Sequence, residues 1–303
     1  MFTRVDVPKW IFFLSALILI TFVLLIFLFL FITAYPVLSR EGLGFILGST
    51  WDYETGTYGI APFLAGTFWV TVITLIIVLP IGILTAIYVA EIAPRSVAAL
   101  INPIIELLVG IPSIVFGLFG FYILQQYFRD SINPFIHGVF GWIPIFANKN
   151  PSTGSGILIA SLVLAIMVLP TIVALSREAM TAIPDAFREA SYSLGATRQE
   201  TIFRVVVPAA SQGIMTSVVL GAMRAMGETM AVVMLIGNVP RTPTSILDKG
   251  ATMTTKILND IGYYIALDDP KAALFSIAVV LFIFEMAFVA IMRLISSRWK
   301  VKY

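Results

Sequence analysis

The feature that most constrains this chain is a series of long apolar segments that contain almost no charge. The first, residues 10–39, has 30 residues and no charged side chain, whereas a helix needs about 20 apolar residues to cross a bilayer. We therefore predict an all-α membrane protein in one transmembrane domain, residues 1–303, whose core covers about residues 59–295. The six transmembrane helices that we predict cover about residues 10–35, 59–90, 97–128, 156–176, 209–236 and 272–295.

The composition supports the same class of protein. Hydrophobic residues make up 59% of the chain and charged residues 12%, against roughly 45–50% and 25% in soluble domains. So little charge could not cover a water-exposed surface, which excludes a soluble enzyme. The chain has no cysteine and a single histidine, His137. Disulfides, thiolate metal sites and histidine metal clusters are therefore excluded, and no metal site is expected.

Six spans place both ends of the chain on one side of the membrane, and the basic residues indicate which side. Lysine and arginine are enriched in cytoplasmic segments. Here they favour the side that holds both termini and residues 177–208, which we call the central loop. That side carries Arg4, Lys9, Arg95, Arg177, Arg188, Arg198, Arg204, Arg293, Arg298, Lys300 and Lys302, and the other carries Arg40, Arg129, Lys149, Arg241, Lys249, Lys256 and Lys271. We therefore expect a multi-pass plasma (inner) membrane protein with both termini in the cytoplasm (N-in/C-in).

The central loop is predicted to form two short helices. A helix over residues 184–194 suits the proline in its first turn and a C-terminal stop at Gly195. Thr197 and Glu200 have the spacing of a capping box, which opens a second helix that ends before Pro208. The first helix carries a small apolar face at helical spacing that a short helix pair cannot bury alone. The residues of this face are Phe187, Ala190, Ser191 and Leu194.

Three interpretations of the central loop compete. The first is a connector that packs on its own bundle. The second is a helix-turn-helix for DNA, but the loop balances four arginines with four acidic residues. Such a balance does not suit a phosphate backbone, so no nucleic acid partner is expected. The third is a docking site for a cytoplasmic partner, with a helix laid in a groove.

The order of residues in the central loop resembles the EAA loop of ABC-transporter permeases. Glu189-Ala190-Ser191 is followed by Gly195 and then by an apolar run that ends in Pro208. Ser191 stands where the name-giving pattern has alanine. The resemblance implies a type I ABC importer permease fold, in which this loop fits a cleft on the ATPase subunit. It also implies that Glu189, Ala190 and Gly195 are the residues that couple to the ATPase.

The chain shows no phosphate-binding P-loop. The pattern Gly-x-x-x-x-Gly-Lys-Ser/Thr, with which such a loop cradles ATP, does not occur in the sequence. We therefore expect ATP and magnesium on a separate partner chain, no cofactor in this chain, and a permease subunit rather than an enzyme.

Two charged residues inside the fifth segment suggest the substrate. Arg224 lies fifteen residues beyond Ala209, or about 22 Å along a helix, near the middle of the bilayer. An arginine there costs about 2.5–3.5 kcal/mol and needs a partner or a water-filled cavity. Glu228 follows at i+4, on the same helix face. The two form either a structural ion pair or an anion site. The arginine fork suits tetrahedral oxyanions, and the glutamate could accept a proton from phosphate but not from sulfate.

Two longer stretches resemble the PstC family of phosphate permease subunits. Residues 224–238 resemble the signature of that family, and residues 106–120 resemble its third-span element. The sister PstA family shares the EAA loop, but the residues after Glu228 resemble PstC more. The resemblance implies that Arg224 and Glu228 lie on the phosphate path. Thr229 and Asn238 are further candidates for its polar lining.

The resemblance also implies partners. A PstA-like permease subunit would form the other half of the pore, a PstB-like ATPase dimer would dock from inside, and an extracytoplasmic phosphate-binding protein would dock from outside, with membrane lipid around the spans. The alternatives are a PstA-type subunit, a permease for another oxyanion such as sulfate or molybdate, and a secondary anion transporter. A role in sensing phosphate through the same complex also stays open.

Four further features complete the predictions. Residues 238–271 form an extracytoplasmic loop with a predicted helix over 245–264. Residues 129–155, aromatic and rich in proline and glycine, are predicted to make an interfacial or re-entrant excursion. Glu106 and Glu285 lie at membrane depth, where each either pairs with a neighbouring helix or takes part in gating.

Overall fold

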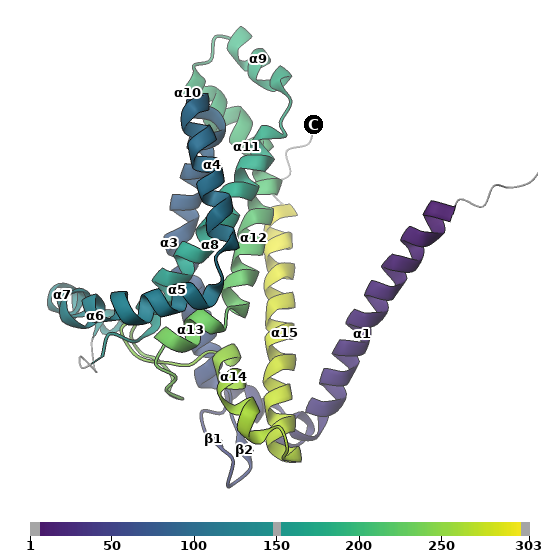
Figure 1. The fold of residues 1–303 in the computed structure, drawn as a ribbon, viewed down its shortest axis with the longest axis vertical. Helices are drawn as coiled ribbons and strands as arrows, with labels where there is room; N and C mark the ends of the chain where they lie inside the picture. Colours follow the sequence, from purple (N-terminus) through teal and green to yellow (C-terminus); the bar gives the residue numbers. More distant parts are fainter. Residues whose placement is uncertain (1–6, 148–152, 298–303) are drawn as a thin grey trace, which may run out of the picture.

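The structure is a computed structural model that describes residues 7–147 and 153–297. It is almost entirely helical (Figure 1). The elements in chain order, with η for π-helical or 3-10 turns, are α1 (Val7–Glu41), α2 (Leu43–Leu47), β1 (Trp51–Asp52), β2 (Thr57–Tyr58), α3 (Ala61–Ile87), η1 (Tyr88–Ile92), α4 (Arg95–Gly110), α5 (Ser113–Phe119), η2 (Gly120–Leu124), α6 (Gln125–Tyr127), η3 (Phe128–Ile132), α7 (Asn133–Phe140), η4 (Pro144–Phe146), α8 (Ile157–Thr181), α9 (Asp185–Ser193), α10 (Arg198–Thr201), η5 (Ile202–Val206), α11 (Val207–Ala209), α12 (Ser211–Gly227), α13 (Met230–Leu235), α14 (Met253–Tyr264) and α15 (Asp268–Ser297).

The predicted spans are present, in two forms. Within the described residues, four helices are long and apolar enough to cross a membrane as single pieces. They are Pro8–Glu41, Ala61–Ile92, Ile157–Thr181 and Asp268–Leu294. Two bent helix pairs supply the remaining spans, one from Arg95 to Phe140 and one from Arg198 to Gly227. The prediction of six spans is therefore confirmed if each bent pair crosses once, but two of the six are not straight helices.

The prediction of one continuous helix over residues 97–128 is wrong. Helix α4 ends at Gly110, and the next helix leaves it at an angle of 92°. Ile111 and Pro112 are extended at the break, with ψ angles of 126° and 139°. A residue before proline avoids the helical region, and proline has no N–H for the helix ladder. Beyond the break, α5 to α7 turn to one side of the long helices (Figure 1). The interfacial or re-entrant excursion of residues 129–155 stays a prediction, and residues 148–152 of that range lie outside the described residues.

The prediction of one continuous helix over residues 209–236 is also wrong. Helix α12 ends at Gly227, Glu228 is extended with a ψ angle of 125°, and α13 starts at Met230. Upstream, the helix of residues 198–209 meets α12 at 65°. This helix passes through Pro208 instead of ending before it. The turn before it has π spacing, with Val207 N–H donating to the Ile202 carbonyl, and this wider turn accommodates the missing N–H.

The packed core lies between α3, α8 and α12. Its buried residues are mostly aliphatic, and small hydroxyl side chains join the helices. Thr74 Oγ1 donates to the Ser161 carbonyl at 3.2 Å, which links α3 to α8. The hydroxyls of Ser176 and Ser217 are 2.7 Å apart and link α8 to α12. Small polar residues of this kind let helix backbones approach closely in a membrane.

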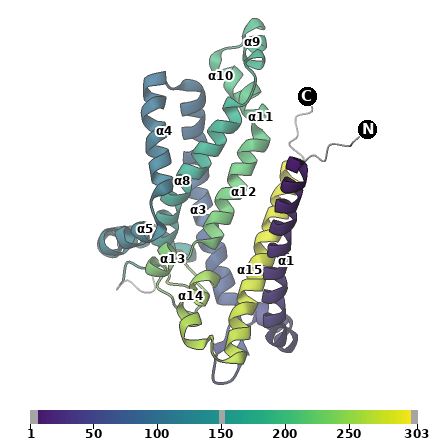
Figure 2. The same ribbon diagram turned by 45° about the vertical axis from the view of Figure 1, so that its right-hand side comes forward.

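Helix α1 packs on α15 and stands apart from the α4 side of the bundle (Figure 1). Phe29 and Phe275 meet edge to face with ring centroids 5.6 Å apart, and Ser276 Oγ donates to the Ala34 carbonyl at 3.1 Å. The rest of α1 presents exposed apolar side chains, as a helix surrounded by lipid or by another chain does. The start of α1 and the end of α15 lie at the same end of the molecule as α9 (Figure 2), which agrees with an even number of spans.

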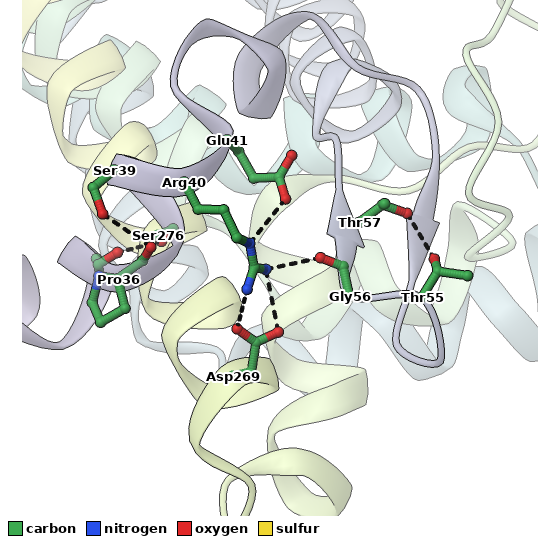
Figure 3. Close-up of polar contacts among 10 residues, drawn as sticks. Pro36, Ser39, Arg40, Glu41, Thr55, Gly56, Thr57, Asp269 and Ser276 are labelled. Atoms are coloured by element: carbon green, nitrogen blue, oxygen red, sulfur yellow. Dashed lines mark hydrogen bonds and ion pairs between the residues drawn. The ribbon is translucent and has the colours of Figure 1, made fainter.

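The two ends of the molecule are built differently. The central loop, with α9 to α11, forms one end, which we call the loop end. The β1–β2 hairpin and α14 form the other, which we call the hairpin end (Figure 1). At the hairpin end, Arg40 Nη1 donates to Asp269 Oδ1 at 2.7 Å and Arg40 Nη2 donates to the Gly56 carbonyl at 2.8 Å (Figure 3). This arginine therefore joins α1, the hairpin and the start of α15.

The helix predicted over residues 245–264 is shorter than expected and begins at Met253. Residues 244–248 form a tight turn in which Asp248 Oδ2 accepts from the backbone N–H groups of Thr244 and Ser245, each at 3.0 Å. Gly250 then pairs with Gly237 in an isolated bridge. These local hydrogen bonds compete with the helix ladder, so α14 starts only at its capping box.

Candidate functional site

The break between α12 and α13 holds three of the four predicted path residues. Arg224 lies in the last turn of α12, and Glu228 and Thr229 form the link to α13. Glu228 Oε1 accepts from the Ala231 N–H at 3.3 Å, and Thr229 Oγ1 donates to the Gly227 carbonyl at 3.1 Å. The two side chains therefore satisfy backbone groups that the interrupted helix leaves open.

The i+4 spacing predicts that Arg224 and Glu228 share one helix face, but in the structure they do not. The helix ends between them, so the spacing rule no longer applies. Within the described ranges, no ion pair joins them. Arg224 Nη1 instead donates to Thr171 Oγ1 on α8, at 3.1 Å. A neutral hydroxyl gives the guanidinium one hydrogen bond and no opposite charge, so the positive charge at this depth is not neutralised by Glu228.

Arg224 lies on the open side of α12. A stripe at helical spacing along this helix is exposed or partly exposed, whereas the opposite face is buried against α8. Two members of the stripe besides the arginine are polar, which is unusual for a surface that faces lipid. The residues of the stripe are Gln212, Thr216, Leu220, Arg224 and Gly227.

A cavity of about 390 Å³ lies beside this stripe, between α12 and α15. From α12 its lining includes Thr216, Leu220 and Met223, and from α15 it includes Met286 and Arg293. Part of the exposed side of α12 thus faces an open space that reaches toward the loop end of α15.

Asn238, the fourth predicted path residue, lies apart from the other three at the far end of α13. Its backbone has a positive φ of 53°, and its side-chain amide donates to the Val233 carbonyl at 2.7 Å. Asparagine tolerates this conformation better than most residues. The structure therefore places Asn238 as a cap on α13, exposed, and separated from Arg224 by that helix.

The two other acidic residues at membrane depth differ in their surroundings. Glu106 is exposed on α4, whereas Glu285 is partly buried on α15. Glu285 Oε1 lies close to the end of α12, 3.8 Å from the point where a Cβ on Gly227 would be. Of the two, Glu285 is therefore the one next to the helix break.

At the loop end, α9 lies within the predicted range of residues 184–194 and is one residue shorter at each end. It begins directly after Pro184 and ends at Ser193. Gly195 has a φ of 83°, its N–H donates to the Tyr192 carbonyl at 2.9 Å, and the Ala196 N–H donates to the Ser191 carbonyl at 3.2 Å. These two bonds form the Schellman motif, in which the left-handed position favours glycine.

The second helix of the central loop opens with the predicted capping box. The Thr197 N–H donates to Glu200 Oε2 at 3.0 Å, and the Glu200 N–H donates to Thr197 Oγ1 at 3.3 Å. The two helices are joined by the buried hydroxyls of Ser191 and Thr201, which are 2.9 Å apart. This contact attaches α9 to the helix that leads into α12.

Only part of the predicted apolar face of α9 is buried. Ser191 packs against α10, while Glu189 and Ala190 are exposed and Leu194 is 89% exposed. Ala190 and Leu194 are therefore not covered by the chain's own described helices.

Arg188 fixes the base of α9 through a contact that the sequence did not predict. Its Nη2 lies 2.6 Å from Glu91 Oε1, and its Nη1 donates to the Ile183 carbonyl at 2.8 Å. The hydrogen-bonded Glu91 carboxylate raises the pKa of Arg188 above its ordinary value. Arg198 Nη2 also donates to the backbone carbonyl of Glu91. Both helices of the central loop are therefore attached to the turn that ends the α3 span.

Comparison with known proteins identifies the family. Residues 79–301 match the family described as binding-protein-dependent transport system inner membrane component. The chain belongs to this family. It is a multi-pass membrane permease subunit of an ABC transporter, not an enzyme, and the expected type I permease fold is confirmed.

Two relatives and one solved structure illustrate the similarity of this permease. The chain is 41% identical to the probable ABC transporter permease protein YqgH of Bacillus subtilis, over 80% of this chain and 74% of that protein. It is 35% identical to the phosphate transport system permease protein PstC of Xylella fastidiosa, over 86% and 81%. A chain of a bacterial alginate ABC transporter, solved with its alginate-loaded periplasmic protein, has a TM-score of 0.59 at 15% identity, over 95% and 93%. That similarity shows the permease fold.

Proposed function

We propose that this permease is the PstC-type subunit of an ATP-driven importer of inorganic phosphate, where it forms half of the translocation pore. The substrate follows from the relatives, several of which are named phosphate transport system permease proteins at 33–35% identity. These names favour phosphate over sulfate or molybdate. Membership of a binding-protein-dependent family favours ATP-driven import over a secondary anion transporter.

The observation that carries the proposal is the position of Arg224. It lies on the open stripe of α12 just before the break, and its one hydrogen bond among the described residues goes to a neutral hydroxyl. An uncompensated arginine inside a membrane is costly, and a phosphate ion would supply both the charge and the acceptors that its planar fork matches. In this proposal Thr229 and Asn238 add polar groups at the two ends of α13, and Glu228 fixes the start of that helix.

The coupling part of the proposal concerns the loop end, which would lie in the cytoplasm. Glu189, Ala190 and Gly195 would dock α9 on a PstB-like ATPase dimer, which would bind ATP and magnesium. Closure of the ATPases would move α9, and two contacts would carry the movement onward. The Ser191–Thr201 contact leads toward α12, and the Arg188–Glu91 pair leads to α3.

The remaining partners would complete the transporter. A PstA-like subunit would supply the other half of the pore. A phosphate-binding protein would dock at the hairpin end, to which residues 238–271 contribute. The solved alginate transporter with its periplasmic protein is an example of such an assembly in this fold.

The proposal is tested by phosphate uptake into proteoliposomes that contain the complete transporter, with ATP on the side of the loop end. We expect uptake that requires both ATP and the binding protein. In Glu189→Lys, uptake and co-purification of the ATPase should be lost together, because the charge of the exposed docking face is reversed. Uptake that ignores ATP would contradict the proposal, and normal uptake in the variant would leave the central loop as a connector.

A further inference from the structure

Glu285 is a carboxyl group in the middle of a spanning helix. It lies on α15, which runs from Asp268 to Ser297, so about half of the helix precedes it and half follows. Its side chain is partly buried, and within the described ranges it makes no hydrogen bond and no ion pair. An ionisable residue at this depth is expensive and is typical of a functional site.

The carboxyl group is directed at the break that ends α12. Glu285 Oε1 lies over the last turn of that helix, 3.8 Å from the position that a Cβ on Gly227 would take. The neighbouring Met286 and the α12 residue Met223 both line the cavity between α12 and α15. Glu285 therefore lies next to residues that line this cavity and beside Gly227, which is about one helical turn from Arg224 along α12.

Glu228, the acidic residue next to the same break, is already engaged. Its Oε1 accepts from the Ala231 N–H at 3.3 Å, and its backbone carbonyl accepts from Thr254 Oγ1 at 3.3 Å. These bonds hold the start of α13 and its contact with α14. Of the two carboxyl groups beside the break, Glu285 is thus the one left available to a ligand.

We propose that Glu285 forms part of the substrate path and accepts a hydrogen bond from a protonated oxygen of the phosphate, while Arg224 balances the charge of the ion. This inference rests on the proposed function and assigns a specificity-determining residue to it. A carboxylate attracts an oxyanion only where that anion presents an O–H group. At neutral pH phosphate carries at least one such proton and sulfate carries none, so the pair favours phosphate.

The absence of cysteine in this chain allows a direct test of accessibility. Glu285→Cys is made in the complete transporter and treated with a membrane-impermeant anionic thiol reagent, with and without inorganic phosphate. We expect labelling that phosphate slows severalfold. The matched control is Ile283→Cys. Ile283 is an apolar residue two positions away on α15, and 54% of its surface is exposed. The control should not react, because lipid excludes the reagent.

A second test asks whether the carboxylate matters for transport. Glu285→Gln should lower phosphate uptake about tenfold, as expected when the charged acceptor of a hydrogen bond becomes a neutral amide, and Glu285→Asp should restore part of it. Glu106→Gln is the control, because it makes the same change at an exposed site on α4 and should transport normally. Assembly is followed by co-purification of the partner chains, which separates a folding defect from a transport defect.

The outcomes separate this inference from the proposed function. Normal uptake in Glu285→Gln, or a Glu285→Cys that is as unreactive as the control, would overturn the role of Glu285 while leaving the phosphate permease intact. A wild-type transporter without ATP-dependent phosphate uptake would overturn the proposed function. In that case the labelling experiment would still show whether Glu285 lines an aqueous path.

Discussion

The guanidinium of Arg188 and the carboxylate of Glu91 form an ion pair of 2.6 Å across 97 residues of sequence. Both side chains are largely buried, with 16% and 10% of their surfaces exposed. The pair ties α9 to the end of the α3 span, so it lies on the route by which a partner that holds α9 could move the membrane helices.

Removal of this pair should uncouple the loop end from the bundle. Arg188→Ala leaves the Glu91 carboxylate buried without its partner, at a cost of about 3 kcal/mol, the lower end of the range for buried pairs. We expect phosphate uptake to fall much more than ATP hydrolysis by the complex. The control is Arg204→Ala, which removes an exposed pair with Glu200 at 3.8 Å in the same loop and should change little. Equal uptake in the two variants would contradict the coupling role.

A second prediction follows from the left-handed backbone conformation of Gly195. Gly195→Ala meets no atom within 4 Å, so its cost comes from the backbone alone and is about 1–2 kcal/mol. The end of α9 should shift, and ATPase co-purification should weaken. Gly195→Asn should behave nearly like the wild type, because asparagine tolerates a positive φ. An alanine variant with unchanged ATPase binding would show that the docking surface does not depend on this turn.

The hydroxyl of Thr171 is expected to orient Arg224. Thr171→Val keeps the shape of the side chain but removes the acceptor at 3.1 Å, so the guanidinium should become less well positioned. Uptake should fall severalfold, mainly through a higher KM for phosphate presented by the loaded binding protein. Thr171→Ser should restore it, since the hydroxyl returns. A serine variant as defective as the valine variant would indicate a packing role instead.

Much of the fold followed from local patterns in the sequence. Hydropathy located the four straight spans and the regions of the two bent helix pairs, since apolar length is a property of each segment alone. Gly195, Thr197 and Glu200 set the boundaries in the central loop for the same reason, because helix caps depend on neighbours within a few residues.

The breaks and long-range contacts could not be predicted in this way. The segment around Glu228 contains no proline and is flanked on both sides by apolar residues, so the average hydropathy continued the helix through it. The Arg188–Glu91 pair joins residues that no local spacing relates. The bond from Arg224 to Thr171 likewise depends on how α8 packs against α12, and the start of α14 depends on the turn that Asp248 closes.

The central claim is that Arg224 binds phosphate on its path through this permease, and ATP-dependent phosphate uptake by Arg224→Ala tests it most directly. The complete transporter is reconstituted with the wild-type chain, with Arg224→Ala and with Arg129→Ala. Arg129→Ala is the control, because within the described structure Arg129 pairs only with its exposed neighbour Asp130. We expect Arg224→Ala to assemble with its partners but to lose at least about tenfold in uptake, while Arg129→Ala transports normally. Wild-type uptake by an assembled Arg224→Ala transporter would contradict the account.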